Sequence, residues 1–145
     1  KTGAMVILFP DNSVIVNRVP LMKLRGKEQP AWSDWWQQWS VSAEGVDRFV
    51  VEQIAARPGQ GVSSMFNFGV SYGFAQAVAV ASGASMHFVT PAAWKAKLSL
   101  LKSDKNASRE MARRLMPKIN GEVARVKDDG VAEAALLAWY GRQYL

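Results

Sequence analysis

The sequence predicts an α/β fold with a mixed sheet that begins as an antiparallel hairpin and continues as parallel strands flanked by helices. Two apolar, β-branched segments, 3–9 and 14–19, are separated by the turn residues Pro10-Asp11-Asn12-Ser13, as in a hairpin. Further apolar strands are expected at 47–53 and 85–89, and they alternate with helical patterns. Because strands joined by helical crossovers run parallel, these later strands should form the parallel part of the sheet.

The length and composition indicate one globular domain spanning residues 1–145. Apolar residues make up 49% of the chain and charged residues 21%, which is typical of a globular domain and not of a disordered chain. No apolar run reaches the roughly 20 residues of a transmembrane helix, and no signal peptide is recognisable. We therefore expect a cytoplasmic protein without a membrane partner, in the bacterial host cytoplasm if a phage encodes it.

The sequence contains no cysteine and one histidine, His87. The absence of cysteine excludes disulfides and thiolate zinc sites, and a lone histidine argues against His-cluster metal sites and Ser–His catalysis. Any bound metal should therefore be held by carboxylates, which favours Mg²⁺ or Mn²⁺.

Positive charge is concentrated between residues 94 and 118. Eight cations and two acids in this segment leave a net +6, which equals the net charge of the whole chain. These cations, called the basic block below, are Lys95, Lys97, Lys102, Lys105, Arg109, Arg113, Arg114 and Lys118. A localised cationic segment suits a polyanionic partner, because each neutralised phosphate releases counterions. The alternative is an ordinary solvated helix face.

A tryptophan-rich helix is expected at 31–39, after a polar, basic connector at 21–30. Its tryptophans recur at i, i+3, i+4 and i+7 and so share one helical face: Trp32, Trp35, Trp36 and Trp39. The simplest interpretation is that this face packs on the sheet. Stacking on nucleic-acid bases is the alternative.

The next helix is expected at 65–81, capped by Ser63 or Ser64. Small residues occupy every fourth position: Gly69, Gly73, Ala77 and Ala81. Because glycine weakens a helix interior by ~1 kcal/mol relative to alanine, the stripe indicates close approach of another element. That element could be the sheet, another helix of the chain or a second subunit. Packing on the sheet is the simplest interpretation, and a dimer contact is the main alternative.

Capping residues mark the remaining helices. Thr90-Pro91 should begin one helix and Ser103-Asp104 the next, which Pro117 should end. The last helix is expected from Asp128-Asp129-Gly130 to Tyr140, with Gly141 as its stop signal.

Four carboxylates stand out by their positions. Glu52 ends a predicted buried strand, so it must either reach solvent or have a partner such as a metal ion. Asp129 and Glu133 lie four residues apart on one helical face, and helix capping explains Asp128 or Asp129 but not Glu133, which precedes an apolar run. If the last helix crosses the sheet, these acids could converge on a metal pair of the kind that cleaves phosphodiesters.

Several longer segments occur in a defined order: Phe49-Val50-Val51-Glu52-Gln53, Arg57-Pro58-Gly59-Gln60-Gly61-Val62, Pro91-Ala92-Ala93-Trp94-Lys95, Asp104-Lys105 and Lys127-Asp128-Asp129-Gly130-Val131-Ala132-Glu133-Ala134. This ordered set resembles the phage and bacterial RuvC-like Holliday-junction resolvases over nearly the whole chain. The resemblance implies an RNase H-like fold. It also implies a homodimer that cuts two strands of branched DNA symmetrically, with two Mg²⁺ or Mn²⁺ ions in each active site.

The resemblance also implies roles for individual residues. Glu52 matches the second acid of the family's catalytic set, and Asp129 and Glu133 match the third and fourth. Asp128 is an alternative to Asp129, because the bacterial enzymes place their final acids three residues apart. Lys95 and Lys105 match basic positions near the scissile phosphate. The other expected DNA contacts are Arg57, Gln60, Lys97, Lys102 and Arg109.

The sequence departs from the family at two points. The family's first acid lies in an Asp-Pro-Gly at the end of the first strand, whereas the segment from Lys1 resembles the residues just after that motif. We therefore expect that strand and its Asp to precede Lys1. Ala55 and Ala56 occupy positions where some relatives have an aromatic wedge. A non-catalytic module that binds branched DNA, and a nuclease specific for other branched or flapped DNA, are the rival interpretations.

Overall fold

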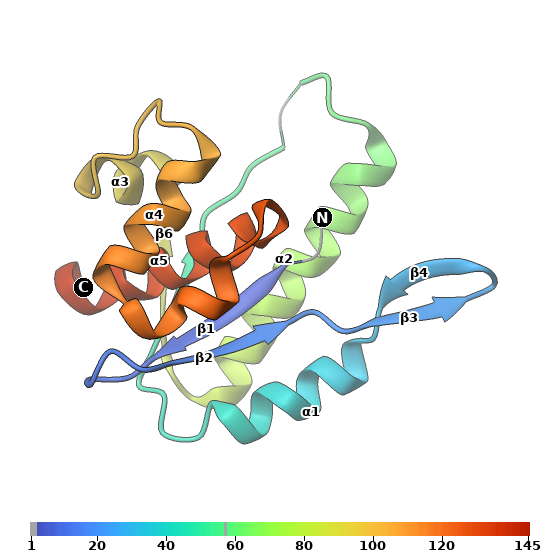
Figure 1. The fold of residues 1–145 in the computed structure, drawn as a ribbon. Helices are drawn as coiled ribbons and strands as arrows, with labels where there is room; N and C mark the ends of the chain where they lie inside the picture. The colour runs from blue at the N-terminus through green and yellow to red at the C-terminus, as the bar shows by residue number, and fades with distance from the viewer. Residues whose placement is uncertain (1–2, 57) are drawn as a thin grey trace.

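The computed structural model describes residues 3–56 and 58–145, without the side chain of Lys105. Its elements, most of them labelled in Figure 1, are β1 (Ala4–Leu8), β2 (Val14–Arg18), β3 (Leu21–Leu24), β4 (Lys27–Pro30), α1 (Trp32–Ser42), β5 (Arg48–Glu52), α2 (Val62–Ser82), β6 (Ser85–Val89), α3 (Pro91–Lys97), α4 (Lys105–Leu115), the 3₁₀ segments η1 (Pro117–Val123) and η2 (Val126–Asp128), and α5 (Asp129–Tyr144). Within this part of the chain, no helix is both long and apolar enough to cross a membrane.

The strands of the described residues form three separate pairs. β1 and β2 pair antiparallel, with Val6 opposite Val16, and β5 and β6 pair parallel, with Val50 opposite His87. Both pairings were expected from the sequence. One continuous mixed sheet was also expected, but among the described residues no hydrogen-bonded ladder joins β1 to β5. The predicted sheet is therefore divided into an antiparallel part and a parallel part.

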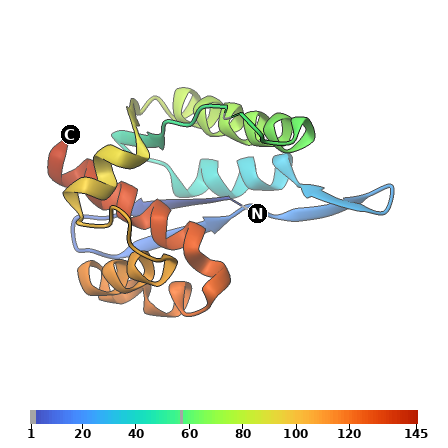
Figure 2. The same ribbon diagram turned by 90° about the horizontal axis from the view of Figure 1, so that it is seen from above.

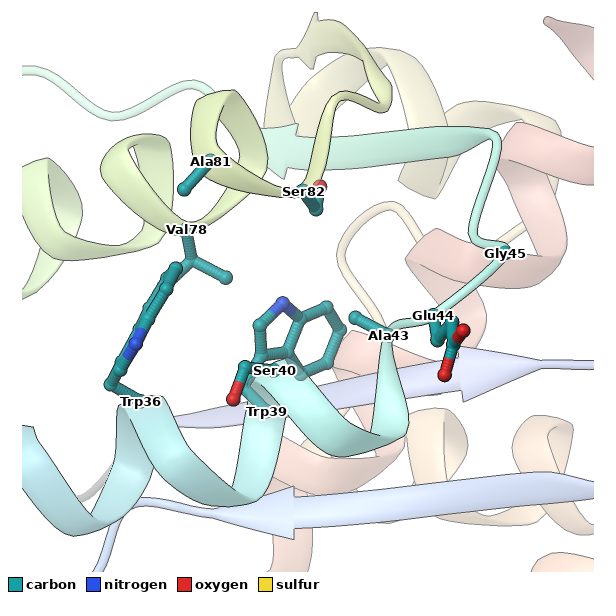
Figure 3. Close-up of a pocket in the computed structure, with 9 residues that line it drawn as sticks. All are labelled: Trp36, Trp39, Ser40, Ala43, Glu44, Gly45, Val78, Ala81 and Ser82. Atoms are coloured by element: carbon teal, nitrogen blue, oxygen red, sulfur yellow. The ribbon is translucent and has the colours of Figure 1, made fainter.

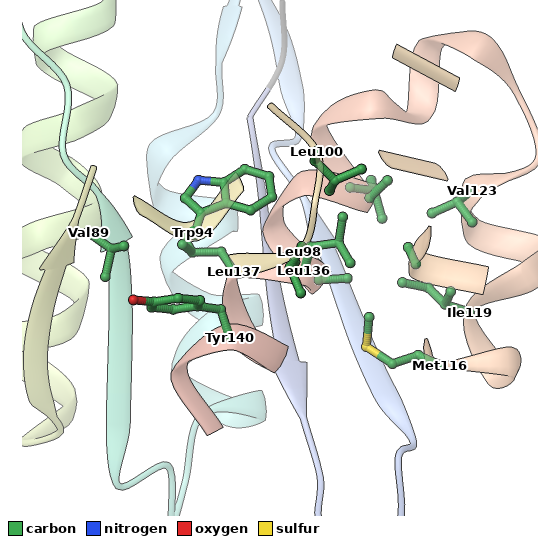
Figure 4. Close-up of a cluster of buried hydrophobic side chains, with 14 residues drawn as sticks. Val89, Trp94, Leu98, Leu100, Met116, Ile119, Val123, Leu136, Leu137 and Tyr140 are labelled. Atoms are coloured by element: carbon green, nitrogen blue, oxygen red, sulfur yellow. The ribbon is translucent and has the colours of Figure 1, made fainter. Parts of the chain in front are cut away.

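The β1–β2 and β5–β6 pairs lie between two helical layers, which Figure 2 shows from above. Alternate β1 residues point to opposite faces, as the two-residue period of a strand requires. Met5 and Ile7 join a buried cluster with α1 and α2, which also contains Phe49 and Val51 of β5. Val6 packs on the other cluster, built mainly from α3, α4, η1 and α5 (Figure 4).

Helix α5 makes a close contact with β5 at Gly141. A stop signal was expected at this glycine, but the helix continues to Tyr144 and Gly141 is buried. A Cβ atom at position 141 would lie 2.4 Å from Val50 Cγ2, so only glycine fits without a shift of the neighbouring strand. Arg48 Nη1 also donates a 2.9 Å hydrogen bond to the Gly141 carbonyl. Gly141 therefore allows close helix–strand packing and does not end the helix.

The sequence predicted the packing of helix α1 better than that of helix α2. In α1, Trp35 and Trp39 are buried as predicted, whereas Trp36 at the edge of the same face is 39% exposed. The stripe of Gly69, Gly73 and neighbouring small residues in α2 is exposed, and no heavy atom lies within 4 Å of a Cβ built at either glycine. The interpretation that this stripe packs on the sheet is therefore wrong.

The segment predicted as a connector, 21–30, is a β-hairpin. β3 and β4 pair antiparallel around Arg25 and Gly26, which have φ angles of 51° and 77°. Two consecutive residues with positive φ form the tight turn that suits the twist of a hairpin, and Gly26 supplies one of them without strain. In Figures 1 and 2 this hairpin projects from the body of the molecule.

Candidate carboxylate site

Glu52 and Glu133 are held by two consecutive residues of α3. Trp94 Nε1 donates a 2.9 Å hydrogen bond to Glu52 Oε1, and Lys95 Nζ lies 2.8 Å from Glu133 Oε1. Trp94 is 1% exposed within the cluster shown in Figure 4, so its indole is fixed by packing. Helix α3 thus links the end of β5 to the start of α5 and places two distant acids beside one short segment.

The parallel pairing of β5 and β6 explains this placement. Glu52, the last residue of β5, lies opposite Val89, the last residue of β6, and Gln53 N donates a 2.8 Å hydrogen bond to Val89 O. Thr90 follows at once and accepts a hydrogen bond from Ala93 N as the N-cap of α3. This cap was predicted from the sequence. Because parallel strands end at the same edge of a sheet, α3 begins next to the carboxylate of Glu52.

Asp129, the first residue of α5, faces Arg109 of α4. Asp129 Oδ1 and Arg109 Nε lie 3.3 Å apart as an ion pair, but neither atom makes a hydrogen bond within the described part of the chain. Both atoms are buried, and a buried carboxylate oxygen without a hydrogen-bond donor is costly. This oxygen is therefore a candidate ligand for a cation.

Asp128 is engaged differently. Its side chain is 3% exposed, and its two oxygens accept three hydrogen bonds of 2.9–3.1 Å from the Arg125 backbone and guanidinium. Arg18 Nη2 lies 3.7 Å away. The hydrogen bonds from Arg125 hold the pKa of the Asp128 carboxyl below its usual value. Asp128 thus stabilises the turn that begins α5, whereas Asp129 has the oxygen without a hydrogen bond.

We expect Asp128→Asn to lower the free energy of unfolding by about 1–2 kcal/mol at pH 7, since it weakens hydrogen bonds to a charged acceptor. The value lies at the low end for buried ion pairs because Arg125 is 59% exposed and screened by water. A pKa depressed in the folded state gives stability that is complete above the unfolded value of about 3.9 and is lost as the pH falls through the folded pKa.

Urea unfolding of the wild type and of Asp128→Asn at pH 7 and pH 3 measures this effect. The gap in stability should narrow at pH 3. Glu44→Gln, a change at an exposed carboxylate, serves as the control and should leave stability unchanged at pH 7. An equal gap at both pH values would show that the Asp128 charge is not the stabilising feature.

The remaining residues predicted to contact DNA are mostly exposed. Lys97 ends α3, Lys102 lies in the loop before α4, and Gln60 precedes α2, each with an exposed side chain. Arg57 and the side chain of Lys105 lie outside the described residues. Arg109 is buried against Asp129, and its Nη2 also bonds to Asn106 Oδ1. The structure therefore places Arg109 with the carboxylates and not on the surface.

The predicted acids are of the chemical type that binds Mg²⁺ or Mn²⁺, but their side chains are not placed close enough together to share an ion. Carboxylate oxygens are the ligands that these ions prefer. However, the described residues contain no group of three or more acidic, histidine or cysteine side chains placed to hold a metal ion. Three of the four predicted acids are instead paired with protein cations: Glu133 with Lys95, Asp129 with Arg109 and Asp128 with Arg125. The described residues therefore do not form an assembled metal centre.

Two cavities differ in their relation to these acids. A small one of about 70 Å³ is lined by residues of α3, α4, α5 and the loop between α3 and α4: Lys95, Leu100, Ser103, Asp104, Ser108 and Glu133. A larger one of about 280 Å³ lies between α1 and α2, where Trp36, Trp39 and Val78 form its walls (Figure 3). None of the predicted site residues lines the larger cavity. The small cavity therefore belongs to the carboxylate site and the larger one does not.

Trp94 is the site residue that sequence reasoning missed. From the sequence, Trp94 was noted only as part of the segment Pro91-Ala92-Ala93-Trp94-Lys95, without a role of its own. A buried indole usually donates a hydrogen bond, and this requirement was the available signal. The spacing of the chain did not show that the acceptor is Glu52.

Comparison with known proteins supports the fold. No family model and no curated protein matches the chain. A solved structure of RuvC from Thermus thermophilus is similar, with a TM-score of 0.51 and 16% sequence identity, over 97% of this chain and 94% of that chain. At this identity the likeness shows a RuvC-like fold alone.

Proposed function

We propose that this protein is a metal-dependent endodeoxyribonuclease that resolves Holliday junctions or other branched DNA by paired, symmetric cuts. The observation behind the proposal is that Glu52 and Glu133 are fixed by adjacent residues of α3, on a fold similar to RuvC. Acids at the end of a strand and at the start of the last helix are the positions that the family resemblance predicted. The protein would act in the cytoplasm.

The cations beside the acids support a DNA substrate. Lys95 contacts Glu133, and Lys97 is exposed two residues further along α3. Cations neutralise phosphates and release counterions, whereas a carboxylate cluster alone would repel DNA. Lys95 would therefore contact the backbone near the cleaved bond, and Lys97 and Lys102 would position the flanking phosphates.

The proposed metal dependence rests on the chemical type of the acidic side chains, and not on a set of acids already placed around one ion. Glu52, Asp129 and Glu133 are the residues that would hold Mg²⁺ or Mn²⁺. Two such ions, if bound by these residues, would supply an activated water and stabilise the leaving oxygen. Lys95 and Arg109 now balance two of these charges, so their release from Glu133 and Asp129 is a requirement of the proposal.

A second candidate function is a DNA-binding module without cleavage. It is favoured by the lack of three converging acids in the described residues. Incubating the protein with a synthetic four-way junction, with and without Mn²⁺, separates the two. Nicked strands that appear only with Mn²⁺ support the nuclease, whereas retarded but intact DNA under both conditions supports the binding module.

We propose that two copies associate through α2. Its exposed stripe combines small and large apolar residues: Val62, Phe66, Gly69, Val70, Gly73, Ala77, Val80 and Ala81. The 21 residues of the helix give it a length of about 30 Å. Small residues let two helices approach closely, and the same stripe on each copy gives the self-complementary contact of a two-fold dimer. Such a dimer would present two sites to two strands.

Phe66→Asp should disrupt this dimer. Phe66 is 72% exposed in one copy, so a charge there should not disturb the fold of the monomer. Buried at the interface, two carboxylates would raise the dimer dissociation constant by about 100-fold or more, or ~2.7 kcal/mol. Sedimentation velocity measures the change, with Asn67→Asp on another side of the helix as the control. A wild type that is monomeric at high micromolar concentration would contradict the proposed dimer.

A further inference from the structure

The β3–β4 hairpin is a strongly exposed element of the described chain. All four β3 residues are exposed, and its large apolar side chains remain in contact with solvent: Leu21 at 47%, Met22 at 43% and Leu24 at 50%. Each strand has four residues and so reaches roughly 13 Å. Figures 1 and 2 agree that no other element lies beside the outer part of the hairpin.

An arm of this kind is poorly stabilised on its own. A single two-stranded hairpin is marginally stable in water, and its outer edges leave backbone groups without partners. Three large apolar side chains within ten residues are also unusual for a segment that only solvent surrounds. These features fit a segment that is covered by a partner when the protein functions.

The charges on the arm indicate the chemistry of that partner. The tip has the cations Lys23, Arg25 and Lys27 and the single acid Glu28, for a net charge of +2. Within the described part of the chain, none of the three cations forms an ion pair. Elsewhere, cations such as Arg18 and Lys118 are neutralised by nearby acids. The tip therefore presents unneutralised positive charge to a polyanion.

We propose that the β3–β4 hairpin is a DNA-contacting arm, separate from the basic block. The inference rests on the proposed function in taking DNA as the polyanion. Lys23, Arg25 and Lys27 would neutralise backbone phosphates. Leu24 lies directly across the hairpin from Lys27, so both project from the same face. Leu24 would contact sugars or base edges while Lys27 contacts the adjacent phosphate, which is how two-stranded ribbons occupy a groove of DNA.

Binding measurements with an arm variant test the proposal. The substitutions Lys23→Gln, Arg25→Gln and Lys27→Gln are combined in a Glu52→Gln background, which keeps the DNA intact. Affinity for a four-way junction, followed by fluorescence anisotropy at several salt concentrations, should fall by tenfold or more at physiological salt. The slope of log K against log salt is negative, and its magnitude should decrease by about 0.9 for each lost phosphate contact, or up to about 2.7.

Two controls separate a direct contact from a loss of structure. Glu28→Gln changes the same arm but removes a negative charge, so binding should stay equal or become tighter. The thermal unfolding midpoint of the arm variant should match that of the Glu52→Gln protein, because the arm is not packed on either core cluster. Equal DNA affinity in the presence and absence of the arm cations would overturn the inference.

The outcomes distinguish the arm from the proposed function. If the Glu52→Gln protein binds no branched DNA, the proposed function itself fails. If it binds DNA and the arm variant binds equally well, only the arm inference fails. If the arm variant changes the sedimentation coefficient and leaves DNA affinity unaltered, the arm contacts a second copy of the chain and the inference is overturned.

Limited trypsin digestion of the unmodified protein gives an independent test. Lys23, Arg25 and Lys27 are trypsin sites on an exposed arm. Bound junction DNA should slow cleavage at these sites, identified by mass spectrometry, by about fivefold or more at saturation. Cleavage at an unchanged rate with saturating DNA would contradict the contact.

Discussion

The variant Glu52→Gln should lose DNA cleavage by at least about 10³-fold, or ~4 kcal/mol of transition-state stabilisation, while binding of a four-way junction changes by less than about threefold. The amide keeps the shape of the side chain and can still accept the hydrogen bond from Trp94 Nε1, so the edge of β5 should keep its structure. What the substitution removes is the negative charge that the proposed chemistry needs. Single-turnover cleavage of a labelled junction measures the rate.

The matched control is Glu44→Gln, which removes one negative charge from an exposed position beside the larger cavity. Its cleavage rate should equal that of the wild type. A Glu52→Gln protein that cuts DNA at a rate near the wild-type value would show that Glu52 is not part of the active site.

The variant Gly141→Ala should lower the free energy of unfolding by about 1–3 kcal/mol, although alanine favours helices more than glycine does. The new methyl group would meet Val50 Cγ2 at a distance that real Cβ atoms do not adopt, and Val50 is β-branched and confined within β5. Either α5 or the strand must therefore move. Chemical denaturation of both proteins measures the change.

A double-mutant cycle identifies the cause. Val50→Ala alone should be destabilising, because it deletes partly buried methyl groups. Combined with Gly141→Ala, it should recover part of the lost stability, since the clash is relieved, and the two effects should not add. Strictly additive effects would mean that α5 and β5 are not in the contact described above.

Local signals in the sequence were sufficient for much of the fold. Thr90 and Asp104 were predicted as helix caps from residue type alone, and both accept the expected backbone hydrogen bond. Apolar segments with turn residues between them predicted the β1–β2 hairpin, and apolar strands alternating with a helical pattern predicted the parallel β5–β6 pair. The caps and the hairpin depend on residues that are close in the chain, so the sequence alone was informative about them. The parallel pair is not local, and it followed from the order of strands and helices.

Features that depend on distant residues were not predictable in this way. A glycine near the end of a helix usually indicates where the helix stops. Gly141 instead gives room for Val50, which is far away in the sequence. The stripe of Gly69 and Gly73 did not show whether this face of α2 packs on a sheet or stays in solvent, because small residues occur in both settings. The same holds for the candidate site. Glu52 was predicted from its place at a strand end, whereas its hydrogen bond with Trp94 could be seen only in the tertiary structure.

The roles of Glu52, Asp129 and Glu133 in metal binding and catalysis stay predictions. The structure shows their protein partners, which are Trp94, Arg109 and Lys95 respectively. Binding of a metal ion by these acids would have to alter these contacts.

Cleavage mapping on a four-way junction, with each of its four strands labelled in turn, tests the central claim most directly. With Mg²⁺ or Mn²⁺, the account predicts cuts at equivalent positions on two opposite strands, and no cuts in EDTA or with the Glu52→Gln protein. Four intact strands with either metal, under conditions where the protein retards the junction in a gel, would contradict the assignment as a nuclease.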